Sequence, residues 1–289
     1  MKRQIDHLVL CVRDLDAAHA AYGRLGFTLT PPARHPWGTG NSLVQLQGNF
    51  LELLALTDLS LIPPPKPGYF SFGAFTESFL KKHEGMAMLV FASQDARRDR
   101  EEFLSRGLHT YEPFDFEREA RLPDGSTATV GFSLAFVTDP RLPEAAFFVC
   151  QQRAPQHFWK PEYQRHANVA RAVVEVTMLA HDPVGLGDLF SKLVEPDALD
   201  AGRGTLNVAL TGGRLAILDA TRLAQRFPGV RLGDVLRKPH FIGFTVAVAD
   251  LAAAEEMLAR NRVPFARADG RLLIAAADNF GAVLEFVKG

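Results

Sequence analysis

The chain has 289 residues, of which 47% are hydrophobic and 22% are charged, and its formal net charge is −1. Such a composition is typical of a folded globular protein long enough for two domains, and it gives no electrostatic basis for binding nucleic acid or an anionic membrane surface. Polar residues interrupt the long apolar runs well before the roughly 20 residues that a membrane-spanning helix needs.

The N-terminus and the two cysteines predict a cytoplasmic protein. The first residues lead directly into a strand-like run, without the apolar core of a signal peptide. Cys11 and Cys150 both lie in apolar strand-like runs, where we expect buried free thiols. Such thiols suit a reducing compartment.

Four copies of one pattern, a strand followed by a helix and three more strands, run along the chain. Each copy aligns on an aspartate after its first strand, and these are Asp14, Asp95, Asp182 and Asp250. The first strands are predicted at 5–12, 86–92, 173–179 and 241–248, with helices at 97–106, 185–193 and 252–260 in the last three copies. We expect Asp14 and Asp250 to be helix N-caps, because their side chains can accept from the first free amides.

Turn residues separate the strands that follow each helix. These strands are predicted at 27–30, 42–47 and 50–55 in the first copy, and at 265–268, 272–276 and 282–287 in the fourth. Gly48-Asn49 and Asp269-Gly270 are expected tight turns. Each copy is therefore a predicted βαβββ module, and the fold class is α+β.

Two longer connections divide the modules. The proline-rich segment 62–68 cannot continue a helix or a central strand. The segment 154–166 is an aromatic linker and the best domain boundary, so the predicted organisation is a module pair in 1–153 and a second pair in 167–289. Short sequential connections favour pairing the first copy with the second and the third with the fourth.

Modules that open with Ile5-Asp6-His7-Leu8-Val9-Leu10 resemble the vicinal-oxygen-chelate superfamily, which includes glyoxalase I, bleomycin-resistance proteins and extradiol dioxygenases. The motifs at 6–9, 35–41 and 50–53 are most similar to its glyoxalase-like domain branch. The resemblance covers nearly the whole chain. It implies two open, curved mixed sheets, each built from two modules, with the site on the concave face. A fold of this kind does not specify one reaction.

The resemblance also implies positions for metal ligands, one in the first strand and one in the last strand of each module. The first-strand positions, seven residues before each aspartate, are His7, Met88, Glu175 and Gly243. The last-strand positions, four residues after the turn glycine, are Glu52, Glu285, Ala216 and, in the second copy, an apolar residue at 147–148.

His7 and Glu52 are thus the candidate ligands for a divalent ion such as zinc, iron, manganese or nickel. Neither module pair supplies the three protein ligands of a usual catalytic metal site, which favours the absence of a tightly bound ion.

Strand alternation predicts where His7 points. Ile5, His7, Val9 and Cys11 are expected on one face of the first strand, opposite the apolar helix-packing face at 8, 10 and 12. His7 then faces the cleft. Two interpretations of His7 and Glu52 stay open: a hydrogen-bonded structural pair inside a filled barrel, or a catalytic or ligand-binding pair.

The loop 35–41 combines a proton carrier, a flat apolar surface and an amide in His35, Trp37 and Asn41. We expect a catalytic role for His35 and substrate contacts for Trp37 and Asn41. His166 and Glu175 complete the substrate-binding candidates. The alternatives are a plain connecting role for His166, and an ion pair with Arg171 or Arg214 for Glu175.

Two functions follow as hypotheses. The first is a glyoxalase-like enzyme of lyase or isomerase type, in which His7 or Glu52 abstracts a proton from a small oxygenated or carbonyl compound while His35 and Asn41 polarise it. The second is a non-catalytic binder of a small apolar or aromatic molecule, as in bleomycin-resistance proteins. Both imply a small-molecule ligand without nucleic-acid or membrane partners, and both leave a homodimer open.

Overall fold

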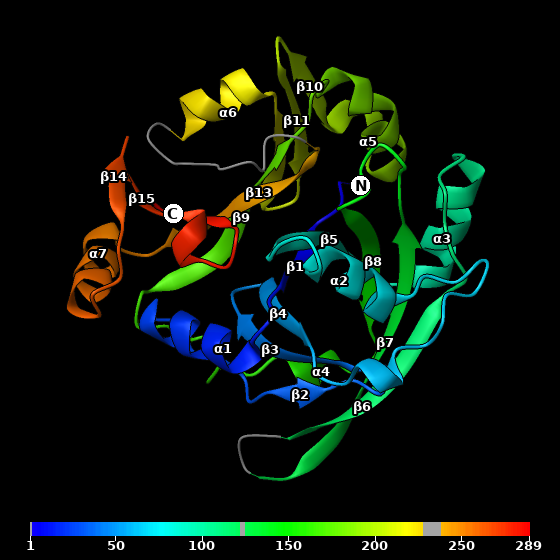
Figure 1. Ribbon diagram of the computed structural model, residues 1–289, viewed down its shortest axis with the longest axis horizontal. Coiled ribbons are helices and arrows are strands. Elements are labelled where there is room, and N and C mark those ends of the chain that lie inside the picture. Colours follow the sequence, from blue (N-terminus) through cyan, green and yellow to red (C-terminus); the bar gives the residue numbers. More distant parts are fainter. Residues whose placement is uncertain (1, 122–124, 228–237) are drawn as a thin grey trace.

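Each half of the chain builds one eight-stranded mixed sheet in the computed structural model, which describes residues 2–121, 125–227 and 238–289 (Figure 1). The first sheet contains β1 (Ile5–Cys11), β2 (Ala33–Arg34), β3 (Thr39–Gln45), β4 (Phe50–Leu56), β5 (Gly85–Ser93), β6 (Phe114–Arg121), β7 (Thr127–Val137) and β8 (Ala146–Gln152). The second sheet contains β9 (Ala170–Leu179), β10 (Leu199–Gly202), β11 (Thr205–Leu210), β12 (Gly213–Leu218), β13 (His240–Val248), β14 (Ala266–Ala268), β15 (Arg271–Ile274) and β16 (Val283–Lys288).

The helices are α1 (Leu15–Arg24), α2 (Phe72–Leu80), α3 (Ala96–Ser105), α4 (Pro155–Phe158), α5 (Gly187–Leu193), α6 (Ala220–Arg226) and α7 (Leu251–Arg260). Asp14 and Asp250 accept hydrogen bonds from backbone amides of the first turns of α1 and α7, which confirms the predicted caps. Asp95 caps α3 in the same way. Within the described residues, none of the helices combines the length and the apolarity that crossing a bilayer requires.

The two sheets have the same strand order. The orders are β2-β3-β4-β1-β5-β8-β7-β6 and β10-β11-β12-β9-β13-β16-β15-β14. In each sheet the first strands of two modules, β1 with β5 and β9 with β13, pair antiparallel at the centre. The α+β fold of paired βαβββ modules is therefore confirmed, and the first copy pairs with the second and the third with the fourth.

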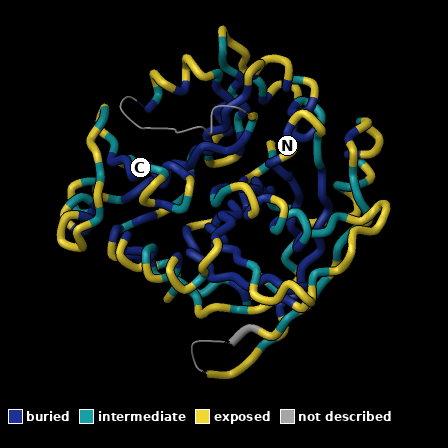
Figure 2. The backbone as a smooth tube through the Cα atoms, viewed as in Figure 1, coloured by how far each residue is buried: buried dark blue, intermediate teal, exposed yellow. Residues whose placement is uncertain are grey.

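One buried hydrophobic cluster joins the two halves. Leu8 and Leu10 of β1 belong to it together with Val176 of β9 and Phe244 of β13. A second, aromatic-rich cluster lies on the other side of the first sheet, and a smaller one lies inside the second sheet. Figure 2 shows the buried residues running along the central strands, while exposed residues cover the outer loops and helices.

The register of β1 against β5 shifts twice, between Ile5 and His7 and between Val9 and Leu10. Val9 and Cys11 belong to the inner cluster of the first sheet, on the predicted face. The grouping of Ile5 with His7 is wrong, because the register of β1 against β5 shifts between these two residues. Ile5 consequently packs with Leu8 and Leu10 in the cluster that both halves share.

The segment 27–30 is not a strand, although its sequence predicts one. Thr28 forms hydrogen bonds with the linker, from its backbone amide to His166 Nδ1 and from its hydroxyl to the Arg165 carbonyl. The first of these bonds engages the backbone amide of Thr28, which a β-ladder would use. The first edge strand is the short β2. The helix α2 was not predicted; it follows the proline-rich segment 62–68.

Asn49, in the turn between β3 and β4, fastens the first sheet to the second. Its side-chain amide donates to the carbonyl oxygen of Val173 at 3.0 Å and accepts from the Val173 amide at 2.9 Å. The backbone amide of Gln47 donates to the Arg171 carbonyl in the same turn. Asn49 thus satisfies both buried backbone groups of one β9 residue, as a neighbouring strand would.

We predict that Asn49→Ala lowers the free energy of unfolding by about 2 to 4 kcal/mol, because it leaves two buried backbone groups of Val173 without partners. Urea unfolding at neutral pH measures this change. Gln47→Ala is the matched control, since the Gln47 side chain is exposed in the same turn. Equal stability of the two variants would contradict the role of Asn49.

Candidate functional site

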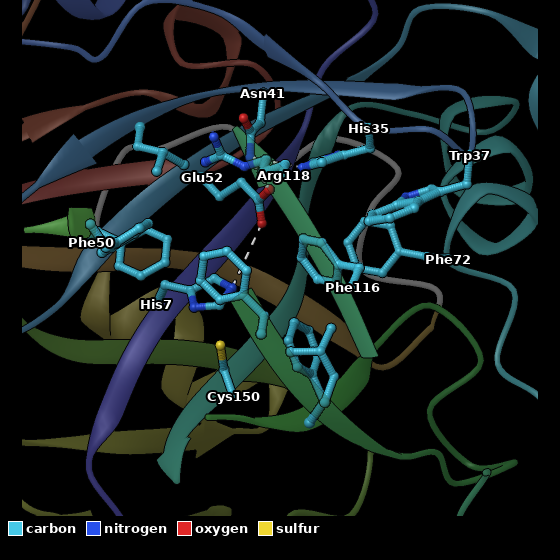
Figure 3. Close-up of a pocket in the computed structure, with 15 residues that line it drawn as sticks. His7, His35, Trp37, Asn41, Phe50, Glu52, Phe72, Phe116, Arg118 and Cys150 are labelled. Carbon is cyan, nitrogen blue, oxygen red and sulfur yellow. Dashed lines mark hydrogen bonds and ion pairs between the residues drawn. The ribbon is translucent and has the colours of Figure 1, made fainter. Parts of the chain in front are cut away.

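A pocket opens on the concave side of the first sheet, walled mainly by aromatic side chains (Figure 3). Its polar lining residues are His7, His35, Asn41, Glu52, Arg118 and Cys150, and its apolar lining residues are Trp37, Leu43, Phe50, Phe72, Phe116, Phe132, Leu134, Phe148 and Phe158. The cavity has a volume of about 50 Å³. This space suits a few water molecules or a small organic molecule.

Two aromatic contacts and one hydrogen bond at a ring nitrogen hold His7. Its ring stacks on Phe50 at 4.2 Å and meets Phe148 edge-on at 5.5 Å. Nδ1 lies 2.6 Å from Asp6 Oδ1, and Gln152 donates to the other oxygen of Asp6 at 3.0 Å. Because a carboxylate only accepts, His7 donates from Nδ1, and Nε2 is the nitrogen free to act in the pocket.

Glu52 lies diagonally across from His7. In the parallel pairing of β1 with β4, His7 is opposite Phe50, and Glu52 is two residues farther along the same face. Its Oε1 accepts a hydrogen bond from Asn41 Nδ2 at 2.6 Å, and its Oε2 lies 3.7 Å from His7 Nε2. The carboxylate is therefore held at one oxygen and directed towards His7 with the other, at only 7% exposure.

His35 supports Asn41 from behind. Its Nδ1 lies 2.8 Å from the Thr39 hydroxyl, its Nε2 accepts from Asn41 Nδ2 at 3.4 Å, and its ring stacks on Trp37. Burial, with a smaller contribution from the charge of Arg118, lowers the pKa of His35 to about 3. This lowered pKa favours the neutral form of His35 near neutral pH, and its predicted catalytic role stays a prediction. Its geometry is that of a positioning residue.

Arg118 enters the pocket from β6, and sequence reasoning missed it. Phe116 and Arg118 line the same pocket because alternate residues of a strand share one face. Figure 3 shows Arg118 on the same side of the cavity as Asn41 and Glu52. Burial lowers the pKa of Arg118 and the charge of Glu52 opposes this effect. The available sequence signal was the alternation of Phe114 and Phe116 with Asp115 and Glu117, which gives Arg118 the same strand parity as the two aromatic residues.

Two more residues were missed for different reasons. Asp6 precedes His7 in the sequence, so strand alternation predicts that the two side chains lie on opposite faces. The register of β1 shifts between Ile5 and His7, and the Asp6 carboxylate contacts the His7 ring. Phe158 belongs to the linker, whose sequence predicts packing but not a place in the pocket wall.

Five of the seven predicted site residues line this pocket: His7, His35, Trp37, Asn41 and Glu52. His166 lies outside it. The Thr28 amide donates to its Nδ1 at 3.0 Å, and its Nε2 lies 2.8 Å from the Gln45 carbonyl. Burial also lowers the pKa of His166. Because both ring nitrogens bind the backbone, His166 fastens the linker to the first sheet instead of contacting a substrate there.

Glu175 lies in the second sheet, away from this pocket. Its carboxylate pairs with Arg214 and Arg226, so the predicted ion pair with Arg214 is present. Arg226 also pairs with Glu285, which accepts from Arg271 as well. Burial raises the pKa of Glu285, against the opposing charge of Arg226. The second sheet thus has an ion network where the first has a pocket with His7 and Glu52.

The residues present fit a resident catalytic metal poorly. His7 Nε2 and Glu52 supply two donor atoms on the concave face, while the matching positions of the second module are Met88 in β5 and Phe148 in β8. A catalytic metal usually has three protein ligands.

A second candidate donor group, formed by Asp6, His7 and Cys150, fits no better. Asp6 is already bound to His7, and burial, with the charges of Asp6 and Glu52, holds the pKa of the Cys150 thiol well above its usual range. A metal ligand needs a thiolate, and the same burial and charges disfavour that form of Cys150.

We predict that acid destabilises the protein through His35. An unfolded histidine titrates near 6.5, well above the pKa of about 3 in the folded protein, so the unfolded state binds more protons between these values. Lowering the pH from 7 to 4 should then cost about 3 kcal/mol at this residue. Urea unfolding at both pH values measures the loss.

His35→Gln should lose correspondingly less stability over this range, because glutamine does not titrate. His109→Gln, at an exposed position, is the control and should behave as the unmodified protein does. An equal pH dependence for His35→Gln and the unmodified protein would show that His35 is not held neutral by burial.

Comparison with known proteins identifies a family whose model covers the first sheet. A family model described as "Glyoxalase-like domain" matches residues 5–194, more than half of the chain. No curated protein matches the sequence.

Three solved structures share the fold at low sequence identity. A hypothetical protein from Staphylococcus aureus has a TM-score of 0.68 at 13% identity, covering 99% of this chain and 100% of its own. A mutant of 4-hydroxymandelate synthase from Streptomyces coelicolor has a TM-score of 0.62 at 12% identity, covering 100% and 94%. A xylose isomerase-like TIM barrel/4-hydroxyphenylpyruvate dioxygenase fusion protein has a TM-score of 0.54 at 12% identity, covering 99% and 49%.

Identity this low carries the fold alone, whereas the family model covers the modules that build the pocket. The chain belongs to the glyoxalase-like domain family of the vicinal-oxygen-chelate superfamily.

Proposed function

We propose that the pocket of the first sheet is the active site of a proton-transfer enzyme, of lyase or isomerase type, for a small carbonyl compound. The observation that carries this proposal is the placement of Glu52. Its buried carboxylate is anchored at Oε1 by Asn41 and faces His7 with Oε2, inside a largely aromatic cavity. A positioned carboxylate in such a site is suited to act as a general base.

Glu52, His7 and Asp6 have different roles in the proposed reaction. Glu52 removes a proton from the carbon next to the substrate carbonyl. His7, when protonated, donates from Nε2 to the carbonyl oxygen, and Asp6 stabilises the positive ring through Nδ1. Return of the proton to a different atom completes an isomerisation, and loss of a leaving group completes an elimination.

The hydrogen-bonded chain around the pocket supports this assignment. It runs from Thr39 through His35 and Asn41 to Glu52, and then across 3.7 Å to His7. Each member restricts the rotation of the next, so the two reacting groups face one cavity with little freedom. His35 and Asn41 therefore position the base.

Proton transfer by side chains fits this donor set better than metal chemistry does. Two structural neighbours are named as a synthase and a dioxygenase fusion protein, but their identities of 12% carry only the fold. In this chain Met88 and Phe148 stand at the positions where further ligands would be needed. The proposed reaction accordingly uses Glu52 and His7 alone.

We predict that Glu52→Gln slows proton exchange by at least about 100-fold, the usual contribution of a general base. Purified protein is incubated in D₂O with a panel of small aldehydes, ketones and 2-oxo acids, and exchange next to the carbonyl is followed by proton NMR. Glu117→Gln, at an exposed position of β6, is the control and should exchange at the unmodified rate. Exchange that is catalysed equally by the Glu52→Gln variant would overturn the proposal.

A non-catalytic binder is the second candidate, and the aromatic lining favours it. Nine of the fifteen lining residues are apolar, which is sufficient to bind a flat apolar molecule. The same panel separates the two functions. Trp37 lines the pocket, so its fluorescence reports ligand binding in either case. A non-catalytic binding protein is favoured if every compound that quenches this fluorescence fails to exchange its protons.

A further inference from the structure

Arg118 is a partly buried cation that has no partner among the described residues. Among the described residues, its guanidinium forms no hydrogen bond or ion pair, although it lines the pocket and the charge of Glu52 acts on it from a distance. Taking a charge out of water is costly unless another group compensates it. A guanidinium with free donors at a cavity wall therefore indicates that the compensating group comes from a ligand.

The arginines of the second sheet show the contrast within the same chain. Arg214, Arg226 and Arg271 all hydrogen-bond to the carboxylates of Glu175 or Glu285. These guanidinium groups are satisfied by the protein itself. The proposed reaction also gives Arg118 no role.

Arg118 stands between the pocket and a second, outer pocket. The two share Leu43, Arg118 and Phe158 in their walls. The outer pocket also contains Arg34 and Lys160 against one acid, Glu119, so its side chains carry an excess of positive charge. An anion approaching through the outer pocket would be attracted towards Arg118.

We propose that the ligand of this site is an organic carboxylate, whose apolar body fills the aromatic pocket and whose carboxylate pairs with Arg118. This inference rests on the proposed function, because it names the substrate class of the same site. The planar fork of a guanidinium matches a carboxylate with two parallel hydrogen bonds. A single arginine at the boundary fits one such monoanionic group.

The position of Glu52 adds an orientation. Like charges repel, so a ligand carboxylate held by Arg118 turns away from the Glu52 carboxylate. The carbon skeleton then faces Glu52 and His7, where the proposed proton transfer takes place. Arg118 would thus be a residue that selects and orients the substrate.

Binding of matched acids and amides tests the proposal. The probes are phenylacetate and 3-phenylpropanoate, each compared with its neutral amide, and binding is followed by tryptophan fluorescence and calorimetry. The chain has two tryptophans. Trp37 lines the pocket and Trp159 contacts Phe50, so both report on it.

We expect at least one acid to bind about 10- to 100-fold more tightly than its amide, the range for hydrogen bonds to charged groups. Arg118→Gln should abolish this preference, and Arg118→Lys should retain only part of it. The control is Arg203→Gln, at an exposed turn of the second sheet, which should keep the full preference. Equal binding of acids and amides, or binding of neither, would overturn the inference.

The variants also separate folding and catalysis from anion recognition. Arg118→Gln removes a partly buried charge that has no ion-pair partner among the described residues, so its melting temperature should equal or exceed that of the unmodified protein. Glu52→Gln should keep the preference for acids while losing proton exchange. If acids bind no more tightly than amides but proton exchange still depends on Glu52, only the role assigned to Arg118 is overturned. If acids bind more tightly than amides but proton exchange does not depend on Glu52, only the proposed reaction is overturned.

Discussion

The parallel pairing of β1 with β4 sets the geometry on which the pocket depends. It places His7 opposite Phe50 and Val9 opposite Glu52, so that His7 and Glu52 are diagonal neighbours on the concave face. A slip of one residue would turn the Glu52 carboxylate into the hydrophobic cluster that joins the two halves, where its burial would be costly. The same hydrophobic pattern that specifies the sheet therefore specifies the register of the two polar groups.

The two halves show how one architecture can carry two different interiors. Their strand orders are the same. Glu285 has the same place in β16, the last strand of the fourth module, that Glu52 has in β4, the last strand of the first module. In the second sheet, however, this carboxylate is neutralised by Arg226 and Arg271. In the first sheet, Glu52 is held by a neutral amide and faces His7 across a cavity. The repeat thus predicts where a site can be, and the partners of each carboxylate decide what it can do.

The sequence predicts the modules from short periodicities. It predicts the pocket residues of the first module from the ligand positions that the family resemblance implies and from the composition of the loop 35–41. Spacing from Asp14 and from Gly48 identifies His7 and Glu52, and the structure brings them within 3.7 Å of each other. Arg118 lies in β6, a strand of the second module that was not predicted from the sequence. Without this strand, the sequence does not show that the Arg118 side chain faces the pocket. The neutral state of His35 comes from burial by distant segments, which no local pattern shows. His166 and Glu175 were expected at a substrate, but their partners lie far along the chain at Thr28 and Arg214.

Asp6 holds the His7 ring with a proton on Nδ1, so that Nε2 faces Glu52 in the pocket, and the proposed proton transfer depends on this arrangement. Long-range ¹H–¹⁵N NMR spectra of protein labelled at histidine test it most directly, with His7 assigned by comparison with a His7→Gln variant. We predict a protonated Nδ1 for His7 in the unmodified protein and a loss of this preference in Asp6→Asn. A bare Nδ1 with the proton on Nε2 in the unmodified protein would contradict the claim.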